Sequence, residues 1–155
     1  MTELQEAVFG ASVERVTVFA NTQNISEVTE GGLGLVHLAC QASGQETRHL
    51  SILLAQGAES CSLSYQGFSP LHLTAWNGDV ERARVLVEAL SPHQLDITGF
   101  GGVTALHLAV LKGHLPLVTL LATTGASLGN GDLVMFTPLH YAAWYGRDQI
   151  AQVGQ

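Results

Sequence analysis

Apolar positions recur with a helical period in short runs that repeat along the chain. Between Gly67 and Asp79, a Ser-Pro pair opens an apolar run and a Gly-Asp pair closes it. The pattern returns over residues 101–114 and 137–146, and more weakly over 32–44. After each break, a second run spaces leucine and valine three or four positions apart, which is typical of an amphipathic helix. The pattern therefore predicts pairs of short helices joined by turns.

One histidine marks each of these units. The markers His37, His72, His107 and His140 lie 33 to 35 residues apart. A period of about 33 with the signature Thr-Pro-Leu-His-x-Ala is typical of the ankyrin repeat. Residues 137–142 carry this signature, and the other units depart from it by one residue or more. The chain thus resembles the ankyrin repeat family, which implies an all-α fold, a solenoid of stacked helix-turn-helix units.

The spacing also predicts how the chain divides. We expect a degenerate capping unit over residues 1–30, a divergent repeat over 31–64, repeats over 65–98 and 99–133, and a truncated repeat over 134–155. Terminal units of a solenoid are expected to be atypical, because they cover the apolar ends of the stack.

The last unit departs from the others at its turn. Met135 stands where the earlier units have Gly32, Gly67 and Gly102. A glycine at such a position normally supplies a positive φ. The sequence therefore predicts an altered turn in the last unit.

The second runs also predict core positions. The spacing of apolar residues in the second runs predicts that Leu86 and Leu120 are buried between helices.

Composition narrows the classes of partner. Charged residues make up only 12% of the chain, and its formal net charge is −7. This balance argues against nucleic acid or an anionic membrane as the main partner, since both require a basic surface. No apolar run reaches the roughly 18 residues of a membrane span. Because Cys40 and Cys61 form no disulfide framework, we expect a reducing location, the cytoplasm, with the nucleus left open.

The histidines and glycines of this chain do not form a recognisable catalytic or metal site. Marker histidines one repeat apart are too distant to share a metal ion, and we expect each to order its own turn by hydrogen bonds. The glycine clusters complete neither a dinucleotide-binding fingerprint nor a P-loop. The kinase motifs His-Arg-Asp and Asp-Phe-Gly are absent from the sequence. We therefore expect no enzymatic activity, no cofactor and no metal.

The candidate binding residues are those that the repeat pattern leaves free. They follow the first helix of a unit or lie between its turn and the Ser or Thr that opens the helix. In ankyrin proteins such positions line the concave face and the tips of the turns. The candidates are Phe68, Trp76, Asn77, Val103, Leu111, Lys112, Phe136, Trp144 and Tyr145. Aromatic side chains are enriched at the centres of protein interfaces, which favours a partner-binding stripe. The alternative is that these side chains pack against the neighbouring unit.

A closer resemblance rests on longer stretches. The segments ELQEAVFG, GLGLVHLACQASG and YQGFSPLHL, and the run over residues 101–152, are similar to the N-terminal ankyrin array of the cardiac troponin I-interacting kinases. In that family more repeats and then a Ser/Thr kinase domain follow. The resemblance implies a parent kinase and a sarcomeric protein as partner, but it gives this chain no catalytic residue.

Three hypotheses on function follow. The chain is a protein–protein interaction module that binds or scaffolds through its concave face. Alternatively, it is a fragment or truncated isoform of an ankyrin-containing kinase, of which it is the regulatory or substrate-recruiting part. The third is a dominant-negative scaffold that is made as it stands.

Overall fold

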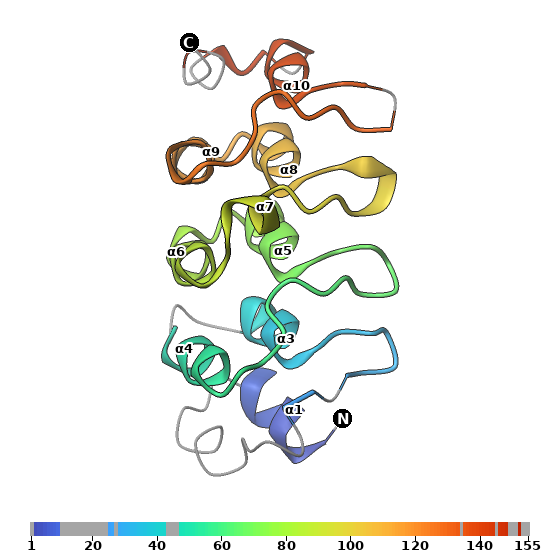
Figure 1. Ribbon diagram of the computed structural model, residues 1–155, viewed down its shortest axis with the longest axis vertical. Helices are drawn as coiled ribbons and strands as arrows, with labels where there is room; N and C mark the ends of the chain where they lie inside the picture. The colour runs from blue at the N-terminus through green and yellow to red at the C-terminus, as the bar shows by residue number, and fades with distance from the viewer. Residues whose placement is uncertain are drawn as a thin grey trace.

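The molecule is a stack of helix pairs from which turns project to one side (Figure 1). The computed structural model describes residues 2–9, 25–26, 28–42, 47–133, 135–144, 146–148 and 152. Within these ranges the only extended pairing is an isolated bridge between Val28 and Gly34. The predicted all-α solenoid is therefore confirmed. No helix among the described residues is long and apolar enough to span a membrane.

The first helix of each unit forms an inner row. This row consists of α3 (Leu35–Gln41), α5 (Pro70–Asn77), α8 (Ala105–Lys112) and α10 (Pro138–Trp144). Each of these helices packs on the next, and α1 (Glu3–Phe9) packs on α3. Most of the predicted capping unit beyond α1 lies outside the described residues.

The second helices form an outer row beside the inner one (Figure 1). They are α4 (Arg48–Ala55), α6 (Val80–Ala89) and α9 (Leu115–Thr124). Two short elements lie in the connections between units, α7 (Pro92–Leu95) and the 3-10 turn η1 (Phe100–Gly102). The helix pairs fall inside the predicted units, while the exact unit boundaries stay a prediction.

Local sequence explains where the helices begin and end. The Ser69 side chain accepts the backbone N–H of His72, and His72 Nδ1 accepts the backbone N–H of Ser69, so the first turn of α5 is capped in both directions. Gly78 ends α5 in the left-handed conformation, with φ 72°. Asp79 Oδ1 then accepts the backbone N–H of Arg82 at 3.1 Å and opens α6.

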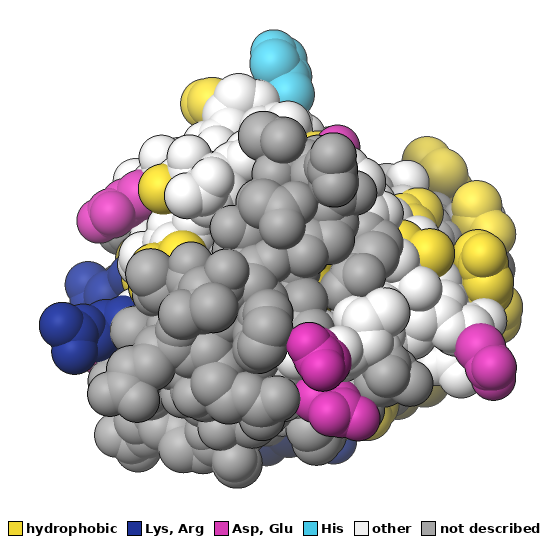
Figure 2. Space-filling model, turned by 90° about the horizontal axis from the view of Figure 1, so that it is seen from below, with side chains coloured by type: hydrophobic (Ala, Val, Ile, Leu, Met, Phe, Trp, Pro, Cys, Tyr) yellow, Lys and Arg dark blue, Asp and Glu magenta, His cyan; other side chains and the backbone are white. Residues whose placement is uncertain are grey.

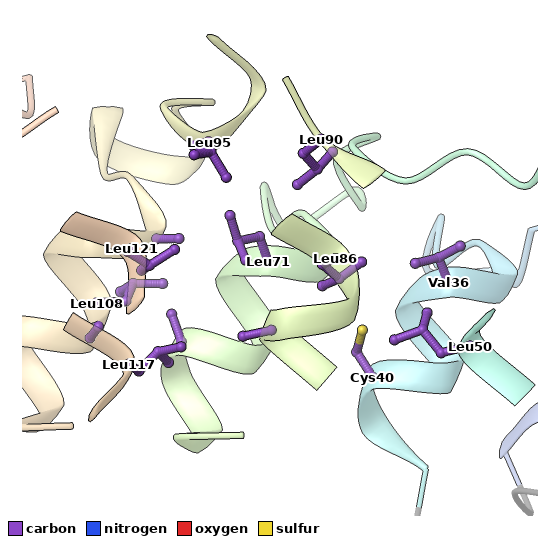
Figure 3. Close-up of a cluster of buried hydrophobic side chains, with 14 of the residues drawn as sticks. Val36, Cys40, Leu50, Leu71, Leu86, Leu90, Leu95, Leu108, Leu117 and Leu121 are labelled. Carbon is purple, nitrogen blue, oxygen red and sulfur yellow. The ribbon is translucent and has the colours of Figure 1, made fainter. Parts of the chain in front are cut away.

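The core lies between the two rows of helices (Figure 3). Leu71 and Leu108 of the inner row meet Leu86, Leu117 and Leu121 of the outer row, and all five are buried. The predicted burial of Leu86 is confirmed.

The prediction for Leu120 is wrong, because this side chain is only half-buried. Leu117 and Leu121, one turn apart on α9, occupy its inward face. Leu120 lies at the edge of that face.

The last turn keeps the conformation of the others. Met135 has φ 67°, close to the 83° of Gly67 and the 74° of Gly102. Its backbone N–H donates to Asp132 O at 2.9 Å, as that of Gly67 donates to Ser64 O. The predicted alteration of this turn is therefore wrong. Met135 is tolerated because its side chain is exposed, although the left-handed region is strained for a residue with a Cβ.

Candidate functional site

The marker histidines connect successive units. In each of the three inner copies, Nδ1 accepts a backbone N–H of its own turn, so Nε2 carries the proton and donates to a carbonyl of the next unit. His37 donates to Phe68 O, His72 to Val103 O and His107 to Phe136 O, each at 2.8 Å. The prediction that each histidine orders its own turn is confirmed. Its bond to the following unit could not be seen in the sequence, because the acceptor is a backbone oxygen.

Burial fixes the charge state of these histidines. It lowers the pKa of His37, His72 and His107 from its ordinary value, because an imidazolium loses its hydration inside the stack. Their bonds to the next unit's carbonyls oppose this shift without overcoming it. The three side chains are therefore neutral structural connectors.

One stripe of side chains runs along α5. His72 and Trp76 are four residues apart on one side of the helix, and Phe68 precedes them in the turn, with its ring 6.4 Å from that of His72. Facing them from the next unit are Phe100, Val103 and Leu108, and together with Gly67 these residues enclose a pocket of about 180 Å³. We call it the first pocket.

A second pocket of about 270 Å³ lies at α10 and repeats the same stripe. It is lined by Leu111, Phe136, His140, Tyr141 and Trp144. The ring of Phe136 lies 6.1 Å from that of Trp144 and 5.9 Å from that of His140, measured between centroids. Tyr141 is fixed at the base, since its hydroxyl donates to Asp132 Oδ2 at 2.6 Å and its ring lies edge-on to His107.

Six of the nine predicted residues converge on these pockets. Phe68, Trp76 and Val103 line the first, and Leu111, Phe136 and Trp144 line the second. The two tryptophans are substantially exposed, by 45% for Trp76 and 76% for Trp144. Phe68, Val103 and Leu111 are half-buried against the core, so for these three the alternative of packing against a neighbouring unit describes the contacts well.

The other three candidates lie elsewhere. Lys112 Nζ is 4.1 Å from the centre of the Trp76 ring, which is a cation–π distance. Asn77 is exposed at the end of α5 and lines neither pocket. Tyr145 lies outside the described residues.

The outermost apolar side chains were missed by the sequence analysis. Tyr65, Phe100 and Leu133 occupy equivalent positions at the tips of three successive turns, and 78% to 79% of each is exposed. Viewed along the stack, hydrophobic side chains gather on the side of the turns, opposite the outer helices (Figure 2). Their spacing of 33 to 35 residues was the signal that could have identified them.

Three of the candidate residues lie below these tips. Phe68, Val103 and Phe136 lie at the base of their turns, where their carbonyls accept the histidine bonds.

The pockets are apolar and offer binding rather than reactive chemistry. Within the described ranges, no three His, Cys, Asp or Glu side chains are grouped so that they could hold a metal ion. Neither thiol is activated, since burial raises the pKa of both Cys40 and Cys61. The absence of metal and cofactor stays a prediction.

These observations define a helical repeat protein whose units are joined by buried histidines. Residues 86–153 match the family model whose description is "Ankyrin repeats (3 copies)". This part of the chain belongs to the ankyrin repeat family, and the stacked units carry the ankyrin repeat fold.

Known proteins share this similarity over parts of their length. The chain is 29% identical over 136 residues to transient receptor potential cation channel subfamily A member 1 of Homo sapiens, covering 83% of this chain and 12% of that protein. It is 32% identical over 114 residues to human NF-kappa-B inhibitor alpha, with coverages of 71% and 34%. It is 33% identical over 88 residues to human ankyrin repeat and SOCS box protein 3, with coverages of 56% and 17%.

The chain thus spans about a third or less of these relatives. None of the three is named as a kinase, so they support the ankyrin family and not the closer resemblance.

Proposed function

We propose that this chain is a protein–protein interaction module that binds its partner on the face that carries the two pockets. Ankyrin repeat domains are in general modules of this class. The observation that carries the proposal is that Trp76 and Trp144 each line an apolar pocket and remain exposed to solvent. Exposed tryptophans beside a pocket are typical anchors of protein interfaces.

The surrounding chemistry supports binding over catalysis. The pocket walls are aromatic and aliphatic, with His72, His140 and Tyr141 as the members that carry polar atoms in their side chains. His72 is held between its own turn and Val103 O, which leaves it no proton-transfer partner in the pocket. We therefore propose that the chain has no enzymatic activity of its own. We also propose that it acts in the cytoplasm, and imaging of a fluorescent fusion tests this location.

The experiment compares capture by the native chain and by two variants. Trp76→Ala combined with Trp144→Ala removes both anchors, whereas Arg84→Ala changes an exposed residue of α6 on the outer row. A specific partner is lost with the tryptophan variant and kept with Arg84→Ala. Binding isotherms of that partner should show a binding free energy that is less favourable by more than about 2 kcal/mol for the tryptophan variant. Equal binding by all three proteins contradicts the proposal.

A second candidate is the recruiting part of a Ser/Thr protein kinase. It is favoured by the similarity of residues 101–152 to the array of the troponin I-interacting kinases. On this proposal the partner is a sarcomeric substrate or regulator, and the pockets select it. Sequencing of the transcript tests it, because a reading frame that continues past Gln155 into a kinase core supports it and a stop codon there contradicts it.

A further inference from the structure

A serine or threonine precedes proline at three places in the chain, residues 69–70, 91–92 and 137–138. Proline-directed Ser/Thr protein kinases recognise such a pair and phosphorylate the hydroxyl that comes before the proline. Each of the three pairs opens a helix, since α5, α7 and α10 begin at the prolines. The pairs therefore have the same local position, and the fold decides which hydroxyl a kinase can reach.

The first and third hydroxyls are engaged within their own turns. Ser69 is buried, and its hydroxyl oxygen lies 2.7 Å from Nδ1 of His72. Thr137 is half-buried, and its hydroxyl oxygen lies 2.8 Å from Nδ1 of His140. Each hydroxyl oxygen also accepts the backbone N–H of its histidine. A kinase must therefore open the first turn of the helix to reach either of them.

Ser91 differs from both, because glutamine stands three residues later in place of histidine. The Gln94 side chain accepts the backbone N–H of Ser91 at 2.8 Å, and the Gln94 backbone N–H donates to the Ser91 carbonyl oxygen at 3.0 Å. The Ser91 hydroxyl makes no capping hydrogen bond. Ser91, Pro92 and His93 are all exposed. This hydroxyl is thus accessible without local unfolding.

The backbone around Ser91 already has the conformation that a kinase requires. Leu90 has φ −102° and ψ 143°, and Ser91 has φ −74° and ψ 161°, so both residues are extended. Protein kinases bind the residues around the phosphorylated hydroxyl as an extended chain. Pro92 has no backbone N–H that the kinase would leave unpaired. Because described helices of the stack precede and follow this segment, its exposure is independent of the ends of the chain.

The rest of α7 holds the segment in place. Leu95 is buried in the core, and Gln94 Nε2 donates to Cys61 Sγ at 3.4 Å. Asp96, directly after the helix, accepts the backbone N–H of Ser127 on its Oδ1 at 2.7 Å. None of these contacts uses the Ser91 hydroxyl, so a phosphate there leaves them intact.

We propose that Ser91 is a phosphorylation site for a proline-directed Ser/Thr protein kinase. The Ser91 oxygen attacks the γ-phosphorus of ATP, and the bond from that phosphorus to the β–γ bridging oxygen breaks. ADP leaves with the electron pair of that bond, and the hydroxyl proton passes to the base of the kinase. The phosphate adds a charge of about −1.5 to −2 at pH 7 to the connection between two helix pairs. Ser91 lines neither pocket, so its modification does not depend on the proposed binding function.

Phosphorylation of the folded chain and of short peptides tests the proposal. An active mitogen-activated protein kinase with MgATP is the probe, and tandem mass spectrometry locates the phosphate. Synthetic peptides of residues 64–75 and 86–97 present Ser69 and Ser91 without the fold. We expect both peptides to be phosphorylated, whereas the folded chain takes up a single phosphate at Ser91.

Three variants assign the modification. Ser91→Ala should lose the phosphate, and Pro92→Ala should lose it although the hydroxyl remains, while circular dichroism shows the fold intact. Ser51→Ala removes an exposed serine that no proline follows and should leave the modification unchanged.

The peptides make a negative result informative. A folded chain that stays unmodified at Ser91 while its peptide is phosphorylated shows that the fold hides the site, and this overturns the proposal. A peptide of residues 86–97 that the kinase ignores overturns it as well. Modification of Ser69 or Thr137 in the folded chain as fast as that of Ser91 shows that burial does not select the site, which also contradicts the proposal.

Discussion

The units at α5 and α10 carry the same stripe in different surroundings. Phe68, His72 and Trp76 correspond to Phe136, His140 and Trp144, with the same spacing of four. Yet His72 is buried beneath the next unit, while His140 is exposed. Among the described residues, the difference is that the following unit accepts the Nε2–H of His72, while no described unit follows α10.

The turns of these two units also differ in whether a following unit restricts the residue at the positive-φ position. A Cβ on Gly67 would lie 2.9 Å from the backbone nitrogen of Phe100, so the following turn excludes any side chain there. Met135 occupies the equivalent position with the same sign of φ and has its side chain in solvent. The glycine of the inner turn is thus required by the neighbouring unit as well as by its own backbone.

The largest expected contrast is between the core and the pockets. Leu86→Ala should lower the free energy of unfolding by about 2–5 kcal/mol, because it opens a cavity between α5, α6 and α9. Trp144→Ala should lower it by less than about 1 kcal/mol, because that ring is mostly in water. Urea denaturation curves of both variants measure the difference. Equal losses would show that the tryptophan belongs to the core.

The second contrast concerns the two histidines. His72→Ala removes the bond to Val103 O and one half of the α5 cap, so we expect a loss of about 2–3 kcal/mol. His140→Ala removes the hydrogen bonds with Thr137 and an exposed ring contact with Phe136, and we expect a loss of about 0.5–1 kcal/mol. Denaturation of both variants at pH 7.5 checks the order, and a larger loss for His140→Ala contradicts it.

The third prediction uses pH to test the buried histidines together. The pKa of His37, His72 and His107 is lower in the folded chain than the ordinary value of about 6.5, so the unfolded chain takes up protons first. Their contribution to stability is complete above about pH 6.5 and is lost as the pH falls from there through the lower folded pKa. Unfolding free energy should therefore decrease between pH 7 and pH 5.

A matched variant isolates this effect. His72→Gln removes one of the three titrating groups, so its stability should depend less steeply on pH over the same interval. An unchanged slope in this variant would show that other groups cause the acid sensitivity.

Much of the fold could be predicted from local sequence. The repeat spacing, the Ser69 cap, the Pro70 start and the Gly78 end each depend on residues within a few positions of one another. Contacts between residues about one repeat apart could not be predicted from the sequence. The histidine bonds cross 29 to 31 residues and end on backbone oxygens, which no residue type identifies.

The sequence predicted several residues of the candidate site, but it did not predict how deeply each side chain is buried. The pattern identified Trp76 and Trp144, but it did not show that Phe68 is half-buried, because that depends on the following unit. It likewise misjudged Leu120, whose burial depends on the rotation of α9 about its axis. The burial of side chains at the boundary between two units is determined by how the units pack, which the local sequence does not show.

The smallest expected effect concerns the two turns. Met135→Gly should raise the free energy of unfolding by up to about 1 kcal/mol, because glycine adopts a positive φ without strain. The greater flexibility of glycine in the unfolded chain offsets only part of this gain. Gly67→Ala should lower the free energy of unfolding by about 1–2 kcal/mol or more, since the new Cβ is strained at φ 83° and meets the backbone of Phe100. Thermal melting of the two variants gives the signs directly. A stabilising Gly67→Ala, or a strongly destabilising Met135→Gly, would show that the two turns do not share one conformation, and the comparison between the units would then fail at this position.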